Sequence, residues 1–166
     1  MRKVVFLIAA MALLGACAEK PPEVYHGPMA EVADTAVPLD RGSADVFYLA
    51  AVNGKPIEDS VKATASANAS RGFEMTPVAI SRQIPAQPAT LTIVGQRVYA
   101  ATVLGLMNPV AVVRGEIKFT PLPDGIYRVM GELGRGGSAV WIEDEVKGQR
   151  VSDAVESRNS PAAGAH

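Results

Sequence analysis

Very few side chains in this sequence can act as nucleophiles, general bases or metal ligands. The chain has two histidines, His26 and His166, and one cysteine, Cys17. His26 lies in a Pro-rich stretch and His166 is the final residue. We therefore expect neither histidine in the rigid pocket that nucleophilic catalysis or a zinc site requires. The sequence predicts no catalytic residue, no metal and no cofactor, and hence a protein that is not an enzyme.

The acidic cluster Glu143, Asp144 and Glu145 is the main candidate for general acid–base work or calcium binding. On a strand, Glu143 and Glu145 point to one face and Asp144 to the other, which separates the carboxylates. The spaced Asp pattern and Gly of a calcium-binding EF-hand loop are absent. We interpret the cluster as a solvated strand end that turns through Lys147-Gly148.

The glycine-rich stretches GRGG (Gly134–Gly137) and ASRG (69–72) are candidate phosphate loops. Neither ends in the GK[ST] of a P-loop, and the chain has no GxGxxG. We predict turns at both. The formal net charge of −1 argues further against nucleic-acid binding, which needs a basic face.

Two features are candidate binding elements. In YAATVLGLMNP, Leu104, Leu106 and Met107 lie between two expected strands. Such residues usually belong to the core; if exposed, they form a patch suited to a protein partner. Trp141 likewise suits the core better than a sugar-binding platform, because the chain has no second tryptophan and only 5% aromatic residues.

The N-terminus has the pattern of an export signal. Arg2 and Lys3 are followed by the apolar run Val4–Leu14, which is too short to span a bilayer. The sequence Leu14-Gly15-Ala16-Cys17 resembles the lipobox of bacterial lipoproteins, although an ordinary secretory signal is the alternative. The resemblance implies cleavage between Ala16 and Cys17, a diacylglycerol on the Cys17 sulfur and an acyl chain on the new amino terminus.

Such lipidation would anchor the protein, because each buried CH₂ contributes about 0.8 kcal/mol. In the lipoprotein family, aspartate after the cysteine marks inner-membrane retention, so Ala18 favours the outer membrane, on its periplasmic face. Loss of residues 1–16 leaves 14 basic and 17 acidic residues, a net charge of −3. Electrostatic attraction to anionic lipid is then weak, and the lipid itself must be the anchor.

Composition divides the mature chain into three parts. Residues 17–43 are rich in proline and glycine and keep no hydrophobic period, as expected for a tether. Residues 44–151 carry the strand patterns of one domain. Residues 152–166 are small and polar, which predicts a disordered tail.

The domain is expected to be all-β. Strands are predicted near residues 46–52, 73–80, 90–95 and 98–104. They are followed by a meander of 110–119, 125–133 and 138–146, in which polar and apolar residues alternate between Gly-rich turns. About seven strands fit an antiparallel sandwich of the immunoglobulin or transthyretin type, with a small barrel as the alternative. The segment KPIEDSVKATASANASRG predicts one short helix or an ordered loop.

The region Asp45–Val151 also resembles an uncharacterised type of proteobacterial lipoprotein domain, through RGFEMTPV, YAATVLGLMNP, FTPLPDGIYRV and SAVWIEDEVKGQRV. The resemblance implies a β-sandwich and carries no activity with it. We therefore expect an envelope lipoprotein that acts as a non-enzymatic interaction or structural module with an envelope protein partner. The alternative is a module that binds a glycan or a small ligand, with Trp141 as a contact.

Overall fold

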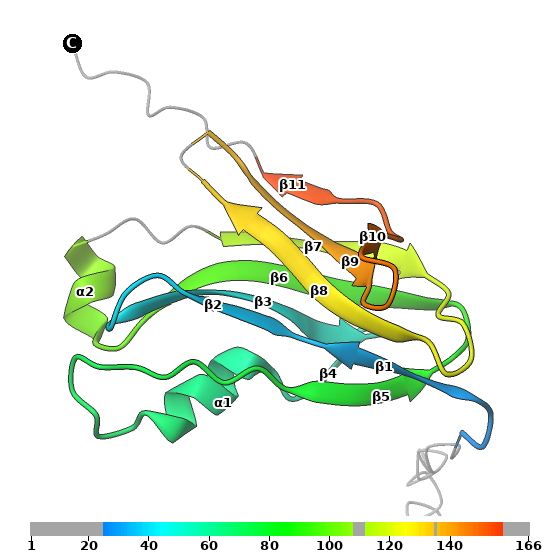
Figure 1. Ribbon diagram of the computed structural model, residues 1–166, viewed down its shortest axis with the longest axis horizontal. Coiled ribbons are helices and arrows are strands. Elements are labelled where there is room, and N and C mark those ends of the chain that lie inside the picture. The colour runs from blue at the N-terminus through cyan, green and yellow to red at the C-terminus, as the bar shows by residue number, and fades with distance from the viewer. Residues whose placement is uncertain (1–24, 108–111, 135, 158–166) are drawn as a thin grey trace, which may run out of the picture.

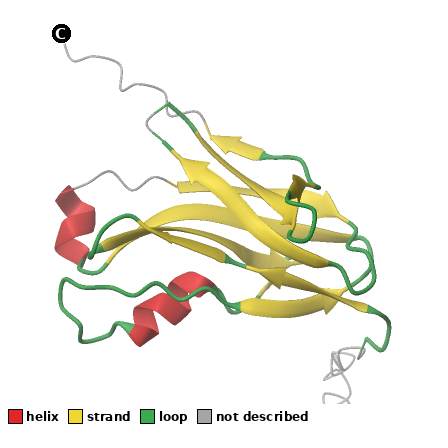
Figure 2. Cartoon of the chain, in the orientation of Figure 1, coloured by secondary structure: helices red, strands yellow, loops and turns green. Residues whose placement is uncertain are grey.

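The computed structural model describes residues 25–107, 112–134 and 136–157. In these residues two sheets pack face to face as an all-β sandwich, with two short helices at its periphery (Figures 1 and 2). The predicted sandwich is confirmed, and two separate sheets replace the alternative of one closed barrel. The first sheet contains β1 (Met29–Ala33), β5 (Ser81–Pro85), β8 (Ile126–Leu133), β9 (Ser138–Asp144), β10 (Gln149–Arg150) and β11 (Val155–Ser157).

The second sheet contains β2 (Thr35–Pro38), β3 (Ser43–Val52), β4 (Lys55–Pro56), β6 (Ala89–Tyr99) and β7 (Val112–Phe119). Its strands lie in the order β2-β3-β6-β7, with β4 beside β3. The first sheet has the order β10-β9-β8-β1-β5, with β11 also beside β9. All pairings are antiparallel except that of β1 with β8, which is parallel and departs from the purely antiparallel expectation.

The core lies between the two sheets and follows from the alternation of the sequence. In β7, Val113, Ile117 and Phe119 are buried, whereas Arg114, Glu116 and Lys118 are exposed, as the pattern predicts. In β8 the same rule buries Tyr127 and Val129. The rings of Phe119 and Tyr127 meet edge to face across the two sheets, with their centroids 5.1 Å apart.

The meander was only partly correct. β8 and β9 form the predicted hairpin, but β7 pairs with β6 in the other sheet. The connection at 120–125 carries the chain from one sheet to the other. A strand buries one face whichever sheet it joins. Alternation therefore does not show whether β7 pairs with β8 or with β6.

The folded domain begins earlier and ends later than predicted. Residues 29–38, expected in the tether, form β1 and β2, and β1 lies between β5 and β8. The predicted start at residue 44 is therefore too late. At the other end, β11 (Val155–Ser157) pairs with β9, so the predicted tail from residue 152 begins too early. Short strands rich in alanine, proline and polar residues carry too little hydrophobic pattern to separate them from a linker.

The remaining elements correct two strand predictions and confirm the helix. β6 runs continuously to Tyr99 and is followed by α2 (Thr102–Met107), where a strand over 98–104 was predicted. Residues 73–80 form no strand. The helix α1 (Ser60–Ala67) lies in the predicted segment, and the Asp59 side chain caps it by accepting a hydrogen bond from the Lys62 N–H at 2.9 Å.

Candidate functional site

The predicted lipidation site falls outside the described residues. Ala16 and Cys17 lie among the undescribed residues, together with the rest of the predicted signal sequence and with His166. His26 is exposed next to the first described residue. Among the described residues no helix is both long and apolar enough to cross a bilayer.

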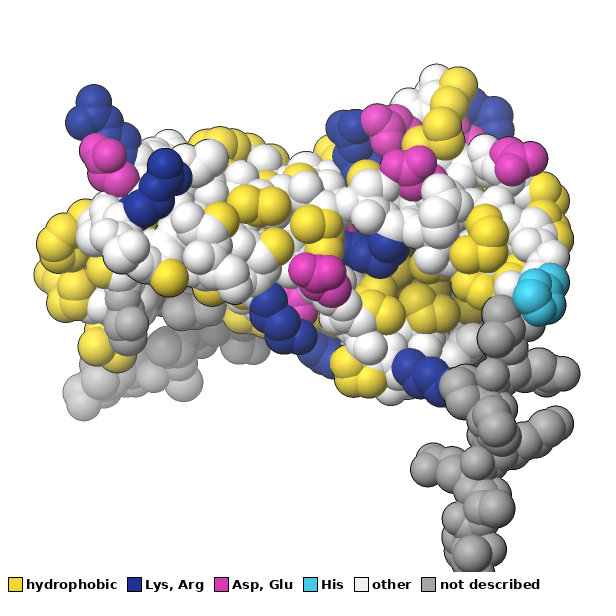
Figure 3. Space-filling view, turned by 90° about the horizontal axis from the view of Figure 1, so that it is seen from below, with side chains coloured by type: hydrophobic (Ala, Val, Ile, Leu, Met, Phe, Trp, Pro, Cys, Tyr) yellow, Lys and Arg dark blue, Asp and Glu magenta, His cyan; other side chains and the backbone are white. Residues whose placement is uncertain are grey.

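An exposed apolar surface lies at one end of the sandwich, which we call the distal patch. Leu106 is 82% exposed and Met107 is 76% exposed, so the more usual expectation of a core position was wrong for both. Leu104 is partly buried. The distal patch is defined by five exposed side chains: Leu39, Phe73, Val103, Leu106 and Met107. Hydrophobic side chains gather at this end of the molecule in Figure 3.

Three separate segments assemble the distal patch. The turn between β2 and β3 hydrogen-bonds to the other two, because the Arg41 carbonyl accepts from Met75 N at 2.8 Å and the Gly42 carbonyl accepts from Ala100 N at 2.8 Å. A Cβ at Gly42 would lie 3.0 Å from the Phe73 carbonyl oxygen and 3.3 Å from Leu104 Cδ1. Glycine therefore allows the Phe73 loop and α2 to approach each other over this turn.

A polar cavity of about 550 Å³ adjoins the distal patch. It is lined by Arg41, Arg71, Glu74, Met75 and Thr76. Arg41 and Glu74 form an exposed ion pair at 3.9 Å, and Arg71 donates to Thr76 Oγ1 at 3.0 Å. An apolar centre with a polar, arginine-bearing rim is the usual anatomy of a protein interface.

Trp141 is half-buried on the outer side of the first sheet. The guanidinium of Arg150 lies 4.2 Å from the centre of its ring, a cation–π contact that covers one ring face. Trp141 does not line the polar cavity beside the distal patch. The ring is thus neither fully in the core nor arranged as an open platform.

The acidic cluster ends β9 and leads into a turn, as its sequence predicts, but Asp144 is buried and not solvated. Asp144 accepts from Lys147 Nζ at 2.9 Å, from Lys147 N at 2.9 Å and from Val146 N at 3.1 Å. The Lys147 side chain and then its backbone N–H lower the pKa of the Asp144 carboxyl. Glu145 pairs instead with Arg128 on β8. The carboxylates therefore close a turn and do not converge on one ligand.

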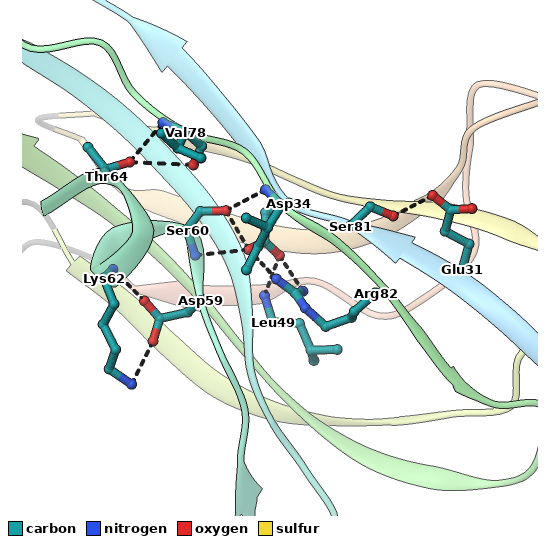
Figure 4. A network of polar contacts seen from close by, with 11 residues as sticks. Glu31, Asp34, Leu49, Asp59, Ser60, Lys62, Thr64, Val78, Ser81 and Arg82 are labelled. Atoms are coloured by element: carbon teal, nitrogen blue, oxygen red, sulfur yellow. Dashed lines mark hydrogen bonds and ion pairs between the residues drawn. The ribbon is translucent and has the colours of Figure 1, made fainter. Parts of the chain in front are cut away.

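A buried polar network that the sequence did not predict ties the two sheets together (Figure 4). The Asp34 side chain is fully buried at the corner where the chain passes from β1 to β2. Its carboxylate accepts two hydrogen bonds from Arg82 at 2.6 Å each, one from Leu49 N at 3.0 Å, and two from Ser60, through N at 3.2 Å and Oγ at 2.7 Å. Every lone pair of the buried carboxylate thus has a donor, as burial of a charge requires.

A signal for Asp34 does exist in the sequence. Ala30, Val32 and Asp34 occupy alternate positions, so a strand reading of this stretch places Asp34 on the buried face with the other two. Its partners, Arg82 and Ser60, are far away in the sequence and carry no comparable signal. The network is structural, because the Asp34 carboxylate and the Ser60 hydroxyl are both engaged within the fold.

The described side chains offer no candidate metal site, and comparison with known proteins found no match. Within residues 25–107, 112–134 and 136–157, no group of three or more His, Cys, Asp or Glu side chains is placed to hold a metal ion. No protein-family model, no curated protein and no solved structure matches this chain.

Proposed function

We propose that this chain is an outer-membrane lipoprotein, anchored through acyl chains on Cys17, whose sandwich acts as a non-enzymatic interaction module. The distal patch is its contact surface for an envelope protein. The exposure of Leu106 and Met107 next to three further exposed apolar side chains is the observation that carries this proposal. Single exposed hydrophobic residues are ordinary, but a contiguous group with a polar rim is typical of interaction sites.

The position of the patch favours a protein partner over the membrane that holds the anchor. The described chain, drawn in blue at its start, begins at the end of the sandwich opposite α2 (Figure 1). Eight residue steps from Cys17 to Tyr25 reach at most about 28 Å. β6, with its 11 residues, spans about 33 Å between the two ends. An upright sandwich therefore holds the patch away from the anchoring membrane.

The glycan or small-ligand alternative has less support. A sugar platform needs an accessible aromatic face, and Arg150 covers one face of Trp141. Asp144 and Glu145 next to this strand end are engaged in the turn and in the pair with Arg128. No observation in the described residues favours a glycan over a protein as the ligand.

The anchor is tested by comparing the native chain with Cys17→Ser. We expect the native chain to incorporate radiolabelled palmitate and to sediment with outer membranes, and the variant to do neither. A Cys17→Ser variant that still carries the label and stays in the membrane contradicts the anchor.

The interaction surface is tested by a photo-crosslinking residue placed at position 106 in the lipidated protein. The matched control is position 146, where Val146 is 79% exposed in the turn after β9. We expect a discrete envelope adduct from position 106 that is absent from position 146 and is lost with Phe73→Ser. The same adducts from both positions, or none from position 106, would refute a partner at the distal patch.

A further inference from the structure

The strand β5 leaves part of its backbone without a partner strand. It is the edge of the first sheet, with β1 on one side only. Asp34 N donates to the Ile80 carbonyl at 2.9 Å, and Ala86 N donates to the Pro28 carbonyl at 2.9 Å. These two bonds show that Ile80 and Ala86 turn their backbone groups toward the β1 side. Because alternate residues of an antiparallel strand turn their N–H and C=O to opposite sides, Ser81 and Gln83 direct theirs away from β1.

The outward edge of β5 borders an opening into the sandwich, which we call the mouth. It is a cavity of about 300 Å³ between β5 and the chain that follows β4. Its apolar walls are Val52, Ile57 and Ile84, and the first two are half-buried residues packed against the main core. Figure 3 views the molecule from this side and shows a hollow with hydrophobic side chains at its base. The core therefore reaches the surface at the mouth.

Two other parts of the sandwich, in the described chain, are covered by α1 and β11. α1 covers the neighbouring part of the same side and is held there by the bonds of Ser60 to Asp34. On the opposite side β11 fills the space between the sheets, where Val155 packs directly over Gly115 of β7. The mouth is thus a place where unpaired strand backbone and uncovered core meet.

The unpaired backbone of β5 and the apolar mouth together indicate which kind of molecule would bind here. An acyl chain fills an apolar hollow but makes no use of the N–H and C=O groups of Ser81 and Gln83. An extended peptide beside β5 uses both, because alternate side chains of an added strand point into the mouth while its backbone continues the sheet. Glu58 lies exposed at the rim, and no ion pair or hydrogen bond of its side chain occurs in the described part of the chain, so it complements a basic residue.

We propose that β5 and the mouth bind an extended segment of another protein, with apolar residues at alternate positions and a lysine or arginine beside them. The paired stretch is short. β5 begins only at Ser81, and at its other end Pro85 has no N–H and its carbonyl accepts from Gln87 N. This surface is separate from the distal patch and does not depend on the function proposed for it.

The edge is tested first by amide hydrogen exchange in the full chain. The amides of Ser81 and Gln83 exchange fast in the free protein, and those of Arg82 and Ile84 are protected by β1. Protection of Ser81 and Gln83 in the monomer overturns the proposal, because it means that the edge is already paired.

Binding is tested with the full lipidated chain in detergent, using a random peptide library as the probe. We expect the selected peptides to carry alternating apolar residues next to Lys or Arg, and Gln83→Pro to weaken their binding about tenfold by removing an outward N–H and blocking the added strand. Proline on this outward edge position keeps the β1 ladder, so the fold persists. Gln83→Thr retains the N–H and is the matched control.

The remaining outcomes overturn the proposal. Selection of no peptide above the Gln83→Pro background excludes a peptide site at β5. Peptides that bind Gln83→Pro as tightly as the native chain, or that lose binding with Leu106→Ser/Met107→Ser, belong elsewhere on the molecule. If Gln83→Pro abolishes a dimer in sedimentation, the edge serves a second copy of the chain. If laurate binds and Gln83→Pro leaves that binding unchanged, the mouth is an acyl site.

Discussion

Replacing Arg82 with methionine tests whether the Asp34 network holds the two sheets together. Asp34 receives five hydrogen bonds, and Arg82 supplies two of them together with the compensating charge. Arg82→Met leaves a fully buried carboxylate with its three remaining donors. Breaking a buried ion pair in this way destabilises a protein by about 3–5 kcal/mol, a large share of the roughly 5–15 kcal/mol by which a domain is stable.

The matched control is Arg128→Met, which removes the ion pair with Glu145. Those two side chains are 43% and 36% exposed, so solvent screens the pair and the expected loss is about 0–1 kcal/mol. Urea unfolding at neutral pH measures both variants, and similar m-values show that the same surface is exposed on unfolding. A loss from Arg82→Met no larger than that from Arg128→Met would refute the reasoning.

A double variant, Asp34→Leu/Arg82→Met, separates the charge from the hydrogen bonds. It leaves neither charge unpaired, so we expect it to lose less stability than the sum of the two single variants. It does not return to the native value, because Leu49 N and both Ser60 donors lose their acceptor. Strict additivity in the same unfolding assay would show that Asp34 and Arg82 do not interact energetically.

Three further changes test other parts of the fold. Asp144→Asn should make the melting temperature fall less between neutral and acid pH than it does in the native chain. The reason is that a lowered carboxyl pKa adds stability above about pH 4, and this stability is lost as pH falls through the folded-state pKa. The same pH dependence of melting temperature in both proteins would contradict this. Gly131→Ala should cost about 1–3 kcal/mol in urea unfolding, because its Cβ would lie 2.4 Å from the Ala139 carbonyl oxygen, whereas Gly136→Ala has open space and should cost far less. Asp59→Ala should cost about 1 kcal/mol by the same assay through loss of the α1 N-cap, and equal stability would rule out that capping role.

Local patterns predicted the parts of the fold that depend on neighbouring residues. Alternation in β7 and β8 identified which side chains are buried, because successive residues of a strand point to opposite faces. Asn53-Gly54 predicted a turn, and both residues have positive φ, 49° and 74°, between the paired Val52 and Lys55. The N-terminal signal and the lipidation of Cys17 remain predictions from sequence.

The tertiary structure alone decided how these elements combine. β7 pairs with β6 and not with β8, and β1 pairs with β8 in parallel. The partner of each strand depends on how the two layers bury their faces against each other, and the sequence of one strand does not contain that information. The same holds for Asp34 and Arg82, which are 48 residues apart in the chain. The exposure of Leu106 and Met107 is likewise tertiary: apolar side chains are buried only where another element covers them, and nothing in the described chain covers the end of α2. The sequence by itself determined which residues are apolar and how they alternate; the packing of two sheets decided which of them form the core and which remain exposed.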